Sequence, residues 1–208
     1  VLWNLQDLPT DNAICRWNDV GIPEMCKMEW SADNSFVKAM YSRIYYQIPI
    51  ANVFIKETSD ESMTEKGFSN EDQEELRMYR AEARFLRALS YYHAMDLFGN
   101  VPFVDETSPI GVFLPEQIQR ADLFSWIESE LKAIENILLT ASAAPYGRAS
   151  QSACHALLAK MFLNAEVYTG TEKNQDCITY SQKIIDTYYR TGSHKRKNIS
   201  RLRVEPEQ

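Results

Sequence analysis

The chain has 208 residues, 45% of them hydrophobic and 25% charged, so it can bury a substantial core and is not a disordered chain. Its apolar runs are far shorter than the roughly 20 residues that cross a bilayer, which excludes a transmembrane helix. The net charge of -7 is uneven, because residues 190–208 hold six Lys and Arg against two Glu (+4), leaving -11 on residues 1–189. Such an acidic body repels phosphate backbones, so we expect no nucleic-acid binding.

The segment 8–33 has neither a helical nor an alternating period, and we expect an irregular, loop-rich N-terminal part. It nevertheless contains two tryptophans, two cysteines and two prolines. A tryptophan in such a segment either plugs a small core or lies exposed in a loop for a ligand. Both alternatives apply to Trp17 and Trp30.

The first predicted helix covers residues 35–57, where apolar side chains recur at steps of three and four. Pro49 should kink or divide it, because proline lacks a backbone donor and clashes with the preceding turn. The polar stretch 59–72 predicts a loop that supplies Ser69 or Asn70 as the N-cap of the next helix.

Four further helices are predicted beyond this loop. The second covers residues 74–99 and ends at Gly99, a residue suited to a left-handed C-cap. The third follows Pro115, which suits a first helical turn; the others cover 151–168 and 176–188. The third carries the clearest apolar stripe, with spacings of three and four: Phe124, Ile127, Leu131, Ile134 and Leu138.

Short connections between these helices favour antiparallel hairpins in series, which is typical of tetratricopeptide-like arrays. The predicted fold is therefore all-α, with helical hairpins after an irregular N-terminal segment. We expect one partial domain over residues 1–189 and a basic tail over 190–208 that is disordered or not native to the protein.

Motifs that carry chemistry are missing from the sequence. There is no zinc-protease, phosphate-loop, nucleophile-elbow or dinucleotide motif. His93 and His155 fall within predicted helices, and Cys154 and Cys177 fit best as small core residues. We therefore predict no catalytic residue, no metal ligand and no cofactor.

One long motif remains, AEARFLRALSYYHAMDLFGNVPFVDE at 81–106, with LPTDN upstream and YGRASQSACHALLAKMFLNAEVYTG downstream. On these blocks the chain resembles the SusD-like (SusD/RagB) outer-membrane glycan-binding lipoproteins of Bacteroidota. The resemblance covers residues 1 to about 189, less than half of a family member. Glu82, Arg84 and Arg87 of the motif are expected to pair between helices rather than to do chemistry.

This resemblance implies the SusD-like fold and noncatalytic capture of oligosaccharides or polysaccharides at the surface of the outer membrane. The full-length protein would be held there by a lipid anchor absent from this chain. It would pass glycan to a TonB-dependent, SusC-like transporter. The alternative is a helical-repeat scaffold that binds a protein partner through its hairpins.

The resemblance also implies a role for the opening loop, where the family places two alternating aromatics and an asparagine against sugar. Trp17 matches the second aromatic, whereas Cys15 stands at the first and Val20 at the asparagine. Neighbouring Arg16, Asn18 and Asp19 could reach sugar hydroxyls instead. The expected ligand-binding residues are Arg16, Trp17, Asn18, Asp19 and Trp30; an arginine of the family site would fall just before Val1.

Overall fold

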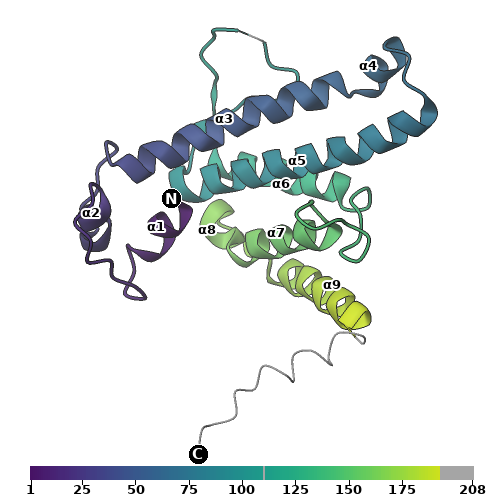
Figure 1. Cartoon of the computed structure of the whole chain (residues 1–208). Helices are drawn as coiled ribbons and strands as arrows, with labels where there is room; N and C mark the ends of the chain where they lie inside the picture. The colour runs from purple at the N-terminus through teal and green to yellow at the C-terminus, as the bar shows by residue number, and fades with distance from the viewer. Residues whose placement is uncertain (110, 193–208) are drawn as a thin grey trace, which may run out of the picture. The chain divides into compact units, whose positions relative to one another are not determined.

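A computed structural model describes residues 1–109 and 111–192 of the chain (Figure 1). The described part divides into two compact units, Val1–Ile50 and a second unit that begins at Ala51. The basic tail predicted from residue 190 lies, from residue 193 on, outside the described residues.

The first unit contains two short helices and most of a long one: α1 (Leu2–Asp7), α2 (Ile22–Lys27) and α3 (Ser35–Glu57), of which residues 51–57 belong to the second unit. Its small core consists of Leu8, Ile22 and Met25. The side chains that pack around this core come from all three helices and from the loop between α1 and α2: Leu5, Cys15, Cys26, Phe36 and Val37. This core joins the irregular segment to the start of α3.

The second unit is built from helices with one short β-ladder. In chain order its further elements are α4 (Asp60–Glu65), α5 (Asn70–Phe98), β1 (Val101–Pro102), β2 (Gln117–Ile118), α6 (Arg120–Ile134), α7 (Gln151–Leu163), α8 (Ala165–Thr169) and α9 (Asn174–Gly192).

Two antiparallel hairpins organise the second unit, as the sequence predicted (Figure 1). In the first, α5 packs on α6: Arg84 pairs with Glu130 at 2.7 Å, while Tyr91 stacks edge-on against Trp126. In the second, α7 packs on α9, where the ring of Tyr180 contacts those of His155 and Phe162. All five residues of the predicted stripe are buried, which confirms their assignment to the core, although Leu138 lies beyond the end of α6.

Two predicted helix boundaries are confirmed by their capping geometry. The Ser69 hydroxyl accepts a hydrogen bond from the Asp72 amide and caps α5, because the first amides of a helix lack partners within it. Gly99 ends the same helix with φ at +75°, which favours glycine, although its ψ of -110° lies outside the left-handed helical region.

Pro49 lies inside α3, which continues through it to Glu57, so of the two expected outcomes the division does not occur. Two other predictions about helix boundaries are wrong. The helix expected after Pro115 begins only at Arg120, because residues 117 and 118 pair with β1 instead. The helix expected over 151–168 is interrupted at Asn164, whose side chain donates to the Lys160 carbonyl and competes with the helical backbone bonds.

Candidate functional site

Hydrogen bonds hold the loop between α1 and α2 near its middle, at Cys15, and at its end, at Val20 and Gly21. On one side the Cys26 thiol lies 3.7 Å from the Cys15 carbonyl oxygen. On the other, the Ser35 hydroxyl donates to the Val20 carbonyl at 3.3 Å, and the buried Asn34 amide donates to the Gly21 carbonyl at 3.1 Å. The loop backbone is therefore tied to α2 and to the start of α3.

Gly21 is required where the loop enters α2. Its φ is +93°, and a Cβ atom there would lie 2.8 Å from the Ser35 hydroxyl oxygen and 3.1 Å from the Asn34 amide nitrogen. Asn34 also caps α3, since its side-chain oxygen accepts from the Phe36 amide. The same two residues thus start α3 and fix the end of the loop.

Between these ties the side chains of the loop face solvent. Trp17 is 73% exposed, and Arg16, Asn18 and Asp19 are exposed as well. Among the described residues, no hydrogen bond or ion pair engages any of these four side chains. The loop therefore presents a bare indole ring with polar groups on both sides of it in sequence.

A polar hollow of about 260 Å³ adjoins the end of this loop. Most of its lining side chains are carboxylates, hydroxyls and an amide, and the full lining is Val20, Gly21, Glu24, Glu29, Ser31, Asp33, Asn34 and Ser35. The pKa of Asp33 is held below its usual value by a hydrogen bond and ion pair with Lys38, at 2.7 Å. The hollow thus offers hydrogen-bond acceptors that suit a ligand rich in hydroxyl groups.

Trp30 lies between Glu29 and Ser31, both of which line the hollow. Its side chain is 41% exposed, so it does not serve as a buried core plug. All five residues predicted to contact a ligand therefore present exposed side chains within the first unit.

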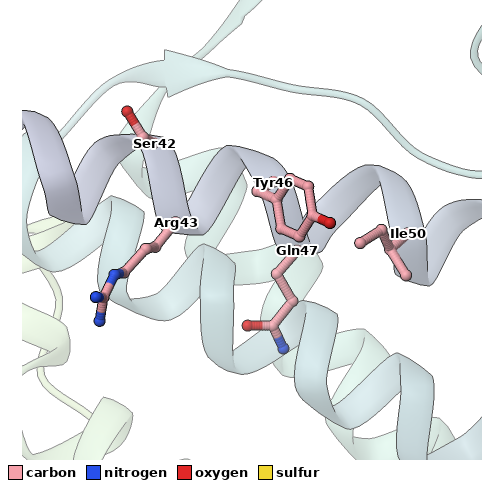
Figure 2. A pocket seen from close by; sticks show the side chains of 5 residues that line it. All are labelled: Ser42, Arg43, Tyr46, Gln47 and Ile50. Atoms are coloured by element: carbon pink, nitrogen blue, oxygen red, sulfur yellow. The ribbon is translucent and has the colours of Figure 1, made fainter.

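A second hollow, of about 620 Å³, lies along the exposed face of α3, and sequence reasoning missed it. Figure 2 shows its lining side chains rising from this helix, with Arg43 and Gln47 on the same side: Ser42, Arg43, Tyr46, Gln47 and Ile50. Tyr46 is 73% exposed and Ile50 54%. The sequence could have indicated this face, because Tyr46 and Ile50 are four residues apart and lie outside the predicted buried stripe.

The charged residues of the long sequence motif form an interior network in the second unit. Arg87 is 1% exposed and pairs with Glu130 at 2.8 Å, with Glu106 at 2.5 Å and with the Asn52 side-chain oxygen at 2.8 Å. Burial opposes the charge of Glu130, but bonds from Arg84 and Arg87 hold its pKa below the usual value. These pairings between elements confirm that the arginines of the motif are structural.

Chemistry beyond binding has little support in the described residues. No group of three or more His, Cys, Asp or Glu there is placed to hold a metal ion, and none of the helices described could span a membrane. Burial raises the pKa of the Cys154 thiol to about 12, so this cysteine is protonated at neutral pH and a poor nucleophile.

Comparison with known proteins identifies the family. A family profile described as "Starch-binding associating with outer membrane" (SusD-like) matches residues 6–163. The chain belongs to the SusD-like family. The starch-binding protein SusD of Bacteroides thetaiotaomicron is 36% identical over 189 residues, which cover 90% of this chain. The predicted family resemblance is confirmed.

Solved SusD-like structures also match the fold. A SusD-like carbohydrate-binding protein from Bacteroides fragilis matches with a TM-score of 0.62 at 25% identity, over 76% of this chain and 29% of its own. A SusD superfamily protein from Bacteroides thetaiotaomicron matches with a TM-score of 0.69 at 21% identity, over 90% and 42%. The predicted helical, SusD-like fold is thereby confirmed, with the two-residue strands as an addition.

The chain spans only part of these relatives. It covers 32% of the length of the starch-binding protein SusD. Two of these relatives are named for binding starch or carbohydrate.

Proposed function

We propose that this chain contributes a noncatalytic glycan-binding surface, with Trp17 as the platform on which a sugar ring stacks. The observation that carries the proposal is an exposed tryptophan on a stretch of loop that is tied on both sides of it, at Cys15 and at Gly21. Sugar rings have apolar C–H faces that pack on a flat indole ring, and their hydroxyls form hydrogen bonds around its edge. Because hydrogen bonds already tie this stretch, binding should cost it less entropy than it would cost an untied loop.

The polar groups near Trp17 form hydrogen bonds with two neighbouring sugar units. Arg16, Asn18 and Asp19 lie next to the platform in sequence and reach hydroxyls of the stacked ring. The carboxylates of Glu24 and Glu29 line the adjoining hollow, where they accept hydrogen bonds from a neighbouring sugar unit. Trp30 offers a second apolar surface beside the same hollow.

The test is a glycan panel measured by calorimetry or affinity electrophoresis on the wild-type chain and on Trp17→Ala. Removal of the ring should weaken binding about 10- to 100-fold, since burying a large side chain is worth about 1.5–3 kcal/mol. Trp3→Ala is the matched control, because Trp3 is also exposed (54%) but lies on α1, outside the loop. Equal losses in the two variants would contradict the assignment of the platform.

We further propose that the full-length protein is anchored by lipid at the surface of the outer membrane and delivers oligosaccharide to a TonB-dependent, SusC-like transporter. The family description, which names association with the outer membrane, supports this location. Copurification of such a transporter with the tagged full-length protein tests the partnership. Recovery of the protein without any transporter, from membranes that contain both, would contradict it.

A second candidate function is a scaffold that binds a protein partner. The hollow on α3 favours it, because exposed Tyr46 and Ile50 there form an apolar patch on a helix. Tyr46→Ala should then abolish retention of the partner and leave glycan binding unchanged. Loss of glycan binding in Tyr46→Ala would instead add this face to the sugar site.

A further inference from the structure

Two of the four cysteines lie together in the first unit. The Cys26 sulfur is 3.7 Å from the Cys15 carbonyl oxygen. Both side chains are partly buried and pack against the small core of Leu8, Ile22 and Met25. The two cysteines are free thiols in this structure, and these two observations bring them into one small cluster.

We infer that Cys15 and Cys26 form a disulfide that closes a ring around the Trp17 loop. Cys15 lies in an irregular segment rather than in a helix, so its backbone can adjust to the separation and dihedral angle that a disulfide needs. The other cysteines belong to the second unit: Cys154 is fully buried with its thiol directed at the Leu131 carbonyl, and Cys177 lies on α9.

The oxidation is a thiol–disulfide exchange with a small disulfide or an oxidised dithiol protein as electron acceptor. One cysteine, as thiolate, attacks a sulfur of the acceptor; a mixed disulfide forms and one acceptor thiolate leaves. The second cysteine then attacks the mixed disulfide, the Cys15–Cys26 bond forms, and the second acceptor thiolate leaves. Two thiols of the protein are oxidised, and the two protons they lose end on the two thiols of the reduced acceptor.

The ring would hold the platform in place more firmly than hydrogen bonds alone. It encloses the residues from Arg16 to Met25, including Trp17 and Gly21. A bridge restricts the chain in the unfolded state and adds a covalent tie at the Cys15 end, where the structure shows only a weak sulfur contact. Disulfides persist at cell surfaces, the location proposed for the full-length protein.

Peptide mapping of the full chain tests the inference without any variant. The protein is equilibrated with oxidised glutathione, its free thiols are alkylated at low pH, and it is then digested with trypsin. Cleavage after Arg16 and Lys27 separates the two cysteines, so a bridge would join peptides 1–16 and 17–27 into one species that reductant splits. We expect that linked species, with Cys154 and Cys177 in unlinked peptides.

Two controls make the result decisive. Cys177→Ser, which removes another partly buried cysteine, should leave the linked peptide unchanged. Brief digestion of the folded protein after Arg16 should release the first 16 residues only when reductant is present. Alkylation of both Cys15 and Cys26, or a bridge from either to another cysteine, would overturn the inference. Neither outcome depends on glycan binding, so failure of this inference and failure of the proposed function can be told apart.

Discussion

Trp17 and Trp126 show how one residue type serves two purposes in two regions of the molecule. Trp126 packs edge-on against Tyr91 and Phe103, at ring separations of 5.3 and 5.0 Å, with the Arg87 guanidinium 5.0 Å from its centre. Trp17 projects from a tied loop, and in the described residues no hydrogen bond engages it. An aromatic ring packed against other rings and a buried arginine stabilises the fold, whereas a ring exposed on a tied loop is available to a ligand.

The largest expected effect comes from breaking the buried network. Arg87→Ala should lower the free energy of unfolding by about 3–5 kcal/mol, because it leaves the partly buried Glu106 without its cation and Glu130 with Arg84 alone. Chemical denaturation of the variant measures this. Arg77→Ala is the control: its ion pair with Asp60 is exposed, so about 0–1 kcal/mol is expected. Similar losses of stability in the two variants would show that the buried network contributes no more than an exposed ion pair does.

Gly21→Ala should have the next largest effect, because it disturbs the tie at the end of the loop. A side chain at φ +93° that also meets the Ser35 hydroxyl should cost about 1–3 kcal/mol and weaken glycan binding. Gly67→Ala separates backbone strain from the close contact, since Gly67 has φ of +73° but open space around its Cβ position. Unchanged binding and stability in Gly21→Ala would mean that the close approach is not maintained in solution.

Acid should weaken the second unit through Glu130. Its pKa is lowered in the folded state, so its contribution to stability is complete above the unfolded value, about 4.3, and is lost as pH falls through the folded value. The free energy of unfolding should therefore decline below about pH 5. Glu130→Gln should flatten this decline; an unchanged slope would assign it to other carboxylates.

The smallest expected effect is in the polar hollow. Glu29→Gln replaces a charged acceptor with a neutral one and should weaken glycan binding about 3- to 10-fold, with stability unchanged, because a hydrogen bond to a charged group is stronger than a neutral one by about 1 kcal/mol. Glu61→Gln, an exposed carboxylate on α4, should leave affinity unchanged. Tighter binding of uronic-acid glycans than of neutral ones would contradict the role given to these carboxylates.

The elements with long apolar periods were predictable from the sequence. The stripe on α6 fixed its buried face, and Ser69 marked the start of α5. The six residues of α4 and the two-residue strands were missed, because such short pieces are set by contacts distant in sequence rather than by a local pattern. Asn164 ends α7 through its own side-chain bond, which helix propensity does not reveal.

The candidate site was predictable in its residues but not in its geometry. The resemblance pointed to Trp17 and its neighbours, and the structure finds them exposed. That the loop is fixed by Asn34 and Ser35, and that a polar hollow lies beside it, depends on chain segments that meet only after folding. The hollow on α3 was not predicted, because its residues lie outside the apolar stripe that marks the buried face of that helix.

The most direct test of the account measures Trp17→Ala twice, once for the free energy of unfolding and once for affinity toward the best glycan of the panel. We predict that unfolding changes by less than about 0.5 kcal/mol, as for an exposed side chain, while affinity falls at least about tenfold. A stability loss of several kcal/mol with unchanged affinity would place Trp17 in the fold and contradict the account.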